Sequence, residues 1–303
     1  MSAIFAVAAD SWVEEKRKFV KNSTYSVYKT IVEKELKGRF DPDPLNFEAS
    51  TQEYILSLLD RGLSPKTSRD ILTVIRMIHE HGAKMGFWTS GKLRVQFPVL
   101  PKASDIPVMN LGDERMLLVY LKRNLSFRNL GLIICLYSGM RIGEICSLKW
   151  EDIDLKDGVI RVRRTIQRVY SYDESRSHLQ IDTPKTQSSS RDIPIARELR
   201  NLVHPLIRIV DPKNYIVTNS PKAIEPRSYR NYFYRLCDEL SIPRIRFHGL
   251  RHSFATRCVE SGCDYKTLSS ILGHTNISTT LNLYVHPDNR QKLKCIERMV
   301  KSL

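Results

Sequence analysis

The sequence predicts a mainly helical protein of two domains, the second of which carries a small antiparallel sheet. Three observations support this fold class. The chain has 303 residues, more than one small core requires. Apolar residues recur at three- and four-residue steps through the first hundred residues, which is the period of amphipathic helices. After Trp150 the apolar period changes to two, which is typical of strands.

The first domain is expected to consist of helices alone. These helices span approximately residues 9–21, 23–36, 50–61 and 64–85. The last is the clearest, because Ile71, Ile75 and Ile78 lie on one face of it and Ser64-Pro65 supplies an N-cap followed by a first-turn proline. We therefore predict a small all-helical domain over residues 1–88.

A second domain is expected to follow a linker. Glycines, prolines and basic residues interrupt the helical pattern over residues 89–107, so we interpret that segment as a linker lying on an acidic surface. Helical periodicity resumes at 111–123 and 127–138, and a third helix is expected beyond Gly139. The second domain then covers residues 108–303.

Strand signals follow Trp150. The expected strands are residues 153–155, 159–162, 165–170 and 191–195. Asp157-Gly158 is a turn signal that joins the first two, and a second hairpin is expected to join the last two. The polar residues 171–190 between them are expected to form an extended loop or a projecting hairpin. Beyond Ile195 we expect helices to the end of the chain, interrupted near Pro212, Pro221, Pro243 and Gly273.

The chain is strongly basic, with 48 Lys and Arg against 33 Asp and Glu and a formal net charge of +15. Such a charge favours a polyanionic partner, although charge alone leaves nucleic acid, an anionic membrane surface and simple solubility open. The longest apolar candidate, Leu130–Tyr137, is far shorter than the roughly 20 residues of a membrane span. The six cysteines form no CxxC pair, so we expect a reducing compartment and no zinc or other metal site.

Several short motifs carry arginine, histidine and tyrosine residues that could react or bind a ligand. They are Tyr137–Ile145, which contains Arg141, the His248–Arg251 segment, the Leu272–Thr275 turn and Tyr284, ten residues after His274. Each motif is weak by itself. A histidine and an arginine three residues apart usually form a solvated helix face, and a tyrosine among leucines usually belongs to a core.

In combination, the motifs resemble the tyrosine recombinases, also called the phage integrase family. The order is an arginine box, a lysine hairpin, HxxR, a glycine–histidine turn and a tyrosine, and the resemblance runs from about Val108 to the end. It implies that residues 1–88 form a SAM-like core-site DNA-binding domain and that the two domains form a C-shaped clamp on DNA. A tail over about residues 287–303 either packs on its own core or docks into a neighbouring subunit, as it does in family members.

The resemblance also implies the catalytic residues. Arg141 and Arg251 correspond to the arginines that bind the scissile phosphate, and Tyr284 corresponds to the nucleophile. Lys185 corresponds to the hairpin lysine, on the strength of Thr183–Thr186 preceding the 191–194 strand. The remaining assignments are His248 and His274 as the histidines and Glu144 as a supporting acid.

These residue types suit displacement at a phosphodiester. Negative charge spreads over the phosphate oxygens in the transition state, and guanidinium groups bind such charge in a bidentate way. A DNA 5′-alkoxide is a poor leaving group, so an acid must protonate it; Lys185 is the expected acid, with Lys149 and Lys156 as other candidates near the sheet. Because the 3′-phosphotyrosine stores the bond energy, we expect no ATP, metal or other cofactor.

Other basic side chains are expected to contact DNA phosphates, which fix the register of a protein on the duplex. Taken singly, each is more typical of a solvated surface charge. The candidates are Lys66, Arg69 and Arg76 in the first domain and Arg227, Arg230, Arg244 and Arg246 in the second.

The resemblance therefore implies a site-specific recombinase that cleaves and rejoins double-stranded core sites, for integration, excision or resolution of a mobile element or replicon. It implies a homotetramer on DNA, assisted by accessory directionality or host proteins, in the cytoplasm with the nucleoid and away from membranes. Because the helical domain begins almost at Met1, we expect a compact form without an arm-binding domain. Two alternatives stay open: a type IB topoisomerase, which relaxes supercoils without pairing two sites, and a non-catalytic DNA-binding regulator.

Overall fold

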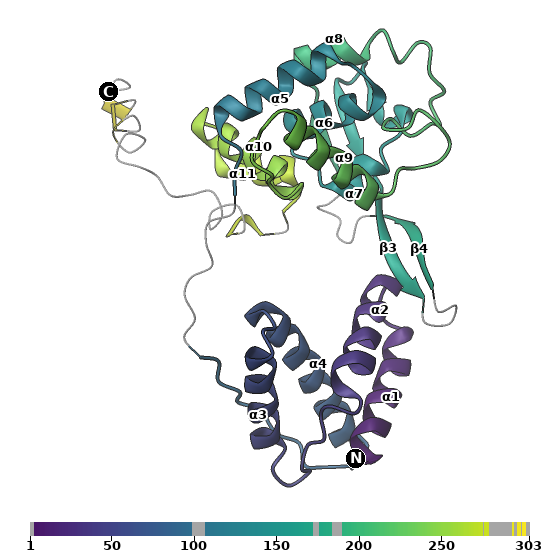
Figure 1. Cartoon of the computed structure of the whole chain (residues 1–303), viewed down its shortest axis with the longest axis vertical. Helices are drawn as coiled ribbons and strands as arrows, with labels where there is room; N and C mark the ends of the chain where they lie inside the picture. Colours follow the sequence, from purple (N-terminus) through teal and green to yellow (C-terminus); the bar gives the residue numbers. More distant parts are fainter. Residues whose placement is uncertain are drawn as a thin grey trace. The chain divides into compact units, whose positions relative to one another are not determined.

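In the computed structural model the chain forms two compact units (Figure 1), one made of Met1–Ala103 with Val169–His178 and the other of Ser104–Arg168 with Leu179–Leu303. The structure describes residues 3–98, 107–171, 176–183, 190–274, 276–278, 293, 296–297 and 299–300. The predicted fold class, mainly helical with small antiparallel sheets, is confirmed. Among the described residues, no helix has the length and apolar character needed to cross a membrane.

The N-terminal part of the first unit is helical, as predicted. Its helices are α1 (Ala3–Arg17), α2 (Asn22–Ile31), α3 (Phe47–Asp60) and α4 (Pro65–Lys84), and α2 continues into a π-helical turn, Val32–Leu36. The first helix starts earlier than predicted, because Phe5 and Ala8 are buried in the core of the unit. The predicted cap of α4 is present, since the Ser64 hydroxyl accepts the backbone N–H of Thr67 at 3.1 Å.

The segment after α4 is packed onto the helical unit. Leu93 is 8% exposed and belongs to the core of this unit, with Phe97 packed against it. The side-chain amide of Gln52 on α3 donates to the carbonyl of Gln96 at 3.0 Å and accepts its N–H at 2.8 Å. Residues 91–98, in the first part of the predicted linker, therefore form an ordered extended segment, which we call the strap. Its alternating apolar residues bury one side of the extended chain.

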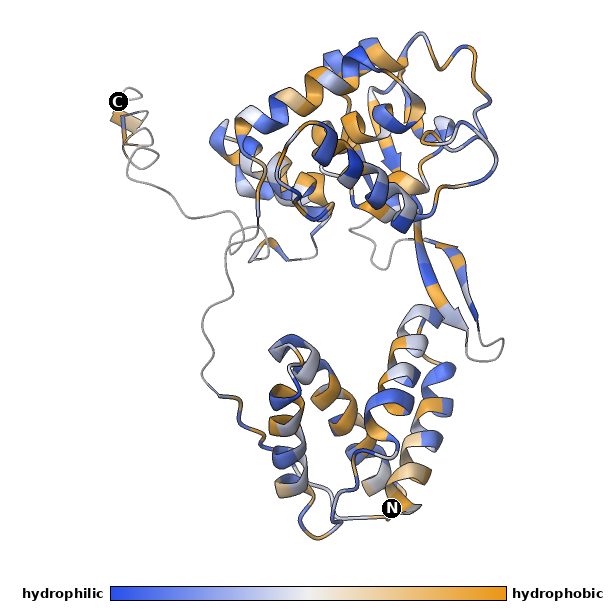
Figure 2. Cartoon of the chain, in the orientation of Figure 1, coloured by the Kyte–Doolittle hydropathy of each residue, from blue (hydrophilic) through white to orange (hydrophobic). Residues whose placement is uncertain are grey.

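The second unit is built around one buried helix. Its helices are α5 (Leu111–Arg123), α6 (Phe127–Ser138), α7 (Ile142–Cys146), α8 (Arg197–Val203), α9 (Pro226–Glu239), α10 (His248–Glu260) and α11 (Tyr265–Leu272). Every residue from Leu130 to Leu136 on α6 is buried. In both units the helices carry hydrophobic as well as hydrophilic stretches (Figure 2). The buried core cluster of the second unit includes Leu130, Ile133 and Leu136, so α6 lies at the centre of this core.

A three-stranded antiparallel sheet packs in this unit. Its strands are β1 (Ile153–Asp154), β2 (Val159–Val162) and β5 (Arg191–Pro194), in the order β1-β2-β5. Ile160 pairs with Ile193 and Val162 with Arg191, so the two isoleucines face the core together. The β1–β2 hairpin turns at Gly158, as the sequence predicts.

The second predicted hairpin was wrong. Strand β3 (Thr165–Ser171) pairs with β4 (Arg176–Asp182), and β5 pairs with β2 instead of β3. Burial explains the difference, because Ile193 fills the core only when β5 lies beside β2, whereas β4 is mostly exposed. Of the two interpretations of the polar stretch, the projecting hairpin is the one observed. Residues 204–225 form turns and isolated bridges, a longer interruption than the breaks expected near Pro212 and Pro221.

Candidate active site

Arg141 stands at a sharp change of direction between two helices. Helix α6 ends at Ser138, and Gly139 adopts a left-handed conformation with φ of 63°, which a glycine takes without strain. Met140 is buried, and Arg141 then starts α7 as its N-cap residue. The Arg141 side chain is 36% exposed, so its guanidinium is accessible from solvent.

Glu144 lies beneath Arg141, and its side chain is only 3% exposed. Its carboxylate accepts the backbone N–H of Arg141 at 2.8 Å and the Nη1 of the same residue at 2.9 Å. Burial by itself would raise the pKa of Glu144, but hydrogen bonds from Arg191 and the charges of Arg191 and Arg141 outweigh burial and lower it. Glu144 is therefore a buried carboxylate that stays ionised.

Arg251 is held at the same place from α10. The residue is 1% exposed, and its guanidinium donates to the carbonyl of Gly139 at 3.0 Å and to that of Leu272 at 2.7 Å. Arg141 reaches the next carbonyl, that of Gly273, at 3.4 Å. The two predicted phosphate-binding arginines are thus joined by the C-terminal ends of α6 and α11, where helix carbonyls favour positive charge.

The two predicted histidines flank these arginines. Desolvation by the surrounding protein lowers the pKa of His248 to about 4, and the charges of His252, Arg251 and Arg141 contribute to this shift. The outer side of the residue is nevertheless exposed. Burial, followed by the charges of Arg251, Arg141, Arg191 and His248, lowers the pKa of His274 to about 4. Both imidazoles are therefore neutral at pH 7.

The left-handed Gly273 sets the place of His274. Gly273 ends α11 with φ of 65°, and the N–H of His274 turns back to the carbonyl of Ser269 at 3.0 Å. His252 packs edge-on against His248, with ring centroids 4.6 Å apart, and is buried. The structure thus brings five predicted residues together: Arg141, Glu144, His248, Arg251 and His274.

Two predicted site residues, Lys185 and Tyr284, lie outside the described residues. Of the other lysine candidates, Lys149 lies 3.8 Å from Glu151 and over the ring of Tyr215, at 5.4 Å from its centroid. These contacts hold the Lys149 side chain beside the 3-10 turn Trp150–Asp152, where Lys149 is ion-paired with Glu151.

Arg191 is a site residue that the sequence reasoning missed. It begins β5, and its Nη1 and Nη2 each donate to one oxygen of Glu144 at 3.0 Å. Its Nε donates to the carbonyl of Ile271 at 2.5 Å. The signal in the sequence was its position two residues before Ile193, on the same face of the predicted strand.

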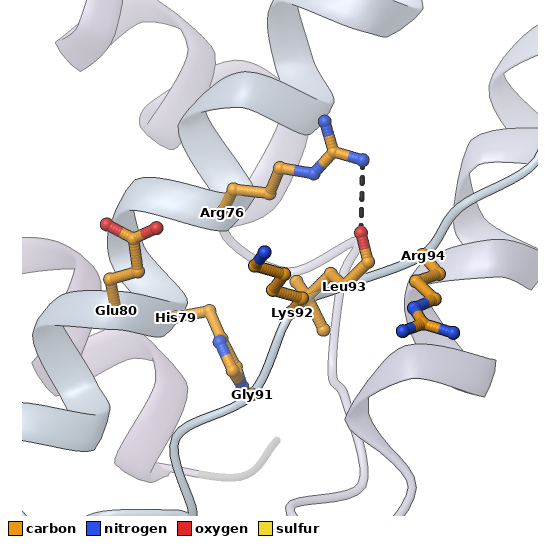
Figure 3. A pocket seen from close by; sticks show the side chains of 7 residues that line it. All are labelled: Arg76, His79, Glu80, Gly91, Lys92, Leu93 and Arg94. Carbon is orange, nitrogen blue, oxygen red and sulfur yellow. Dashed lines mark hydrogen bonds between the residues drawn. The ribbon is translucent and has the colours of Figure 1, made fainter.

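A second basic cluster lies on the helical unit. Arg76, Lys92 and Arg94 line a hollow of about 360 Å³ together with His79, Glu80, Gly91 and Leu93. Figure 3 shows Arg76 and Glu80 on α4 and the other two basic residues on the strap that passes it, with Arg76 donating to the Leu93 carbonyl at 3.0 Å. Lys92 and Arg94 were assigned to the linker and not predicted as DNA contacts.

The other predicted DNA contacts are surface residues in varied settings. Lys66 pairs with Asp70 at 2.9 Å, and the guanidinium of Arg69 lies 4.6 Å from the centroid of the Phe97 ring. Arg244 forms an ion pair with Asp238, which offsets part of its charge. Arg227, Arg230 and Arg246 are exposed on and after α9.

Comparison with known sequences decides the family. The sequence model of the phage integrase family matches residues 113–291. The chain belongs to this family. The match spans the arginine box, the HxxR helix and the glycine–histidine turn, so the family predicted from the order of the motifs is confirmed.

Individual proteins of the family show the same likeness. A tyrosine recombinase XerC-like protein of Caldanaerobacter subterraneus subsp. tengcongensis is 29% identical over 82% of this chain and 69% of its own length. An integrase of transposon Tn1549, solved in complex with a circular intermediate DNA, has a TM-score of 0.77 at 22% identity over 97% of this chain and 99% of that one. A lambda integrase tetramer bound to a Holliday junction has a TM-score of 0.62 at 15% identity, over 93% and 78% of the two chains.

We predict that His248 and His274 of this integrase-family protein titrate near 4 in the free protein, below the ordinary 6.5. As pH falls from about 6.5 towards 4, the unfolded chain binds protons before the folded chain does, so folding stability decreases over that window. A bound DNA phosphate adds negative charge and raises both pKa values. NMR titration of the imidazole C–H signals, with and without DNA, measures the shifts.

The variant Arg141→Gln tests the cause of those shifts. It removes a positive charge that lowers the pKa of both histidines, so both values rise in the free variant. Values near 6.5 in the unaltered free protein would contradict the arrangement of charges described above.

We also predict that Gly139→Ala damages the site more than a matched change elsewhere. A Cβ at this left-handed position would stand 2.5 Å from the Phe254 ring and 2.9 Å from Leu272. At Gly158, with a similar φ of 68°, a Cβ meets nothing within 4 Å. Gly158→Ala therefore destabilises by only the left-handed penalty of about 1–2 kcal/mol. Gly139→Ala destabilises more and slows DNA cleavage, because the carbonyl of Gly139 holds Arg251.

Urea unfolding and a cleavage assay on both variants separate the two effects. Equal destabilisation of the two variants, with equal cleavage rates, would show that the close packing around Gly139 is irrelevant to the site.

Proposed function

We propose that this protein is a site-specific DNA recombinase that cleaves and rejoins strands through a 3′-phosphotyrosine formed by Tyr284. The observation that carries the proposal is the convergence of Arg141, Arg251 and His274 on the C-terminal ends of α6 and α11. Guanidinium groups beside neutral imidazoles form a site of the charge and size of one phosphodiester. A tyrosine that attacks a DNA phosphodiester needs such a site to bind the phosphate and stabilise the charge that develops on it.

The two arginines have different parts in this proposal. Arg141, the more exposed one, receives the incoming phosphate and binds its non-bridging oxygens. Arg251 is 1% exposed and fixed by backbone carbonyls, so its contact with the phosphate follows a local movement of the groups that cover it when DNA binds. Together the arginines stabilise the charge that develops in the pentavalent transition state.

The histidines contribute as neutral groups. A neutral His248 accepts the proton of the attacking tyrosine hydroxyl, and the phosphate raises its pKa from about 4 towards the working pH, which makes it a better base. A neutral His274 donates a hydrogen bond to a phosphate oxygen. Lys185 protonates the departing 5′-oxygen, because an alkoxide leaves poorly without a proton.

DNA is the partner that the charge of the chain favours. The hollow lined by Arg76, Lys92 and Arg94 suits a backbone phosphate, because three cationic side chains outweigh Glu80 and burial keeps the pKa of His79 low and its ring neutral. We assign residues 1–88 to core-site binding and residues 108–303 to catalysis, with the strap as part of the DNA-binding surface. The exposed arginines on α9 and the loop before α10 are the phosphate contacts of the catalytic unit.

Assembly on DNA is part of the proposal. Leu293, Ile296 and Val300 of the tail are 55%, 57% and 57% exposed, so these apolar side chains favour docking into a neighbouring subunit over packing on their own core. The lambda integrase structure that the chain resembles is a tetramer on a Holliday junction. We propose a homotetramer at paired sites of a mobile element, acting in its integration or excision with accessory proteins.

We predict that a nicked suicide substrate traps a covalent adduct with this protein and that Tyr284→Phe abolishes the adduct. A phenylalanine has no oxygen to attack the phosphate, while its ring keeps the packing, so DNA binding is retained. Denaturing electrophoresis of labelled DNA measures the adduct, and a mobility shift measures binding.

The matched control is Tyr120→Phe, which removes a hydroxyl bonded to Glu239 at 2.7 Å on the surface of the same unit and leaves the adduct unchanged. An adduct that persists in Tyr284→Phe would refute the nucleophile. The products of two cognate sites on one plasmid test the wider function: joint molecules support recombination, and relaxation alone would point to a topoisomerase.

We predict that Lys185→Ala stops cleavage of ordinary DNA and that a 5′-bridging phosphorothiolate restores it. A thiolate leaves without protonation, so the substrate bypasses the missing acid. Single-turnover cleavage of both substrates measures the effect, with Lys213→Ala, on an exposed turn of the same unit, as the control. A defect that persists with the phosphorothiolate would move the acid role to another residue.

A further inference from the structure

Arg191 connects two elements that each carry residues of the proposed site. Its side chain is 6% exposed, and the two ends of its guanidinium bind the two oxygens of Glu144 in parallel. Its remaining edge donates from Nε to the carbonyl of Ile271 on α11. One side chain from β5 therefore holds α7 and α11 together.

Each of these contacts leads to a residue proposed to bind phosphate. Glu144 holds the backbone and the Nη1 of Arg141. The carbonyls that follow Ile271 on α11 bind Arg251 and Arg141, and the next residue is His274. Loss of Arg191 would leave Glu144 with Arg141 as its single cationic hydrogen-bond partner among the described residues, and would release one anchor of the α11 end.

We propose that Arg191 is a positioning residue for strand cleavage: its bidentate grip on Glu144 and its bond to α11 fix Arg141 and His274 in the geometry that receives the scissile phosphate. The inference rests on the proposed function, because it assigns no separate activity. The Nε, Nη1 and Nη2 of Arg191 all donate to Glu144 or to the Ile271 carbonyl. Arg191 acts through the groups that it orients, as pre-organisation of charged donors requires.

The planar guanidinium is essential to this role. A lysine keeps the charge but presents a single ammonium, which cannot grip both oxygens of Glu144 and the Ile271 carbonyl in fixed directions. We therefore expect Arg191→Lys to fold, to bind DNA with unchanged affinity and to cleave a suicide substrate about 100-fold more slowly, the scale of loss that small misplacements of catalytic groups produce. Arg191→Gln removes the charge as well and is at least as slow.

Two readouts distinguish positioning from a merely structural role. The first is a double-mutant cycle. If Arg191 acts in part through Glu144, the variant that combines Arg191→Gln with Glu144→Gln loses less rate than the product of the two single losses, and the remaining loss beyond Glu144→Gln reflects the bond to the Ile271 carbonyl. Additive losses of rate would overturn the inference.

The second readout is the pH profile of single-turnover cleavage. The charged and titratable groups that face Glu144 are Arg141, Arg191, His248 on α10 and Cys135 on α6. Removal of Arg191 takes away the main group that keeps Glu144 ionised, so in Arg191→Gln the rate falls with decreasing pH from a higher pH than in the unaltered protein. The double variant lacks the part of this shift that comes from Glu144 and keeps the part that comes from His274, whose pKa Arg191 also lowers. A structural defect alone would lower the rate equally at every pH, and that result would overturn the inference.

Arg161→Gln is the matched control. Arg161 lies on the neighbouring strand β2 and pairs with Asp154 at 2.7 Å and Asp157 at 2.8 Å on the surface, outside the network. Its cleavage rate and pH profile stay those of the unaltered protein. Failure of the unaltered protein to form an adduct would refute the proposed function itself. A normal adduct together with full-rate cleavage by Arg191→Lys would refute only the role of Arg191.

Discussion

The candidate site depends on one buried carboxylate. Removing Glu144 from water is unfavourable, and the ion pairs compensate only because the carboxylate receives hydrogen bonds from two arginines and one backbone N–H. Those donors come from the start of α7 and from β5, so the carboxylate joins elements that are far apart in the sequence. Its negative charge also offsets the electrostatic repulsion between Arg141 and Arg191, which lie on either side of it.

Helix ends supply the other half of this balance. Helices α6 and α11 both terminate in a left-handed glycine, and the carbonyls at these ends accept hydrogen bonds from Arg251 and Arg141. The C-terminal end of a helix carries partial negative charge, which favours such cations. The glycines thus determine both the direction of the chain and the place of the guanidinium groups. In the proposed reaction, an entering phosphate meets the guanidinium of Arg141, which Glu144 and the Gly273 carbonyl already orient.

Local signals made much of the fold predictable. The bounds of α5 and α6 agree with the sequence prediction, because Asn110 and Ser126 cap these helices with their own side chains. The Asp157-Gly158 turn was equally clear, since a left-handed residue is needed there. The partner of β5 was not predictable in this way. Pairing with β2 follows from shared burial of Ile160 and Ile193. The polar segment that forms β4 and pairs with β3 has no alternating pattern that would indicate a strand.

The sequence by itself determined the chemistry of this protein. The residue types and the order of the motifs Arg141, HxxR, His274 and Tyr284 are properties of the chain, and they predicted the family that the comparison confirmed. Only the tertiary structure decided which other side chains serve these residues. Arg191 looked like an ordinary strand residue until β5 was placed beside β2, where its guanidinium meets Glu144 and the end of α11. The reason is physical: a motif records the groups that react, whereas the contacts that orient them arise from packing between distant segments, which leaves no fixed spacing in the sequence.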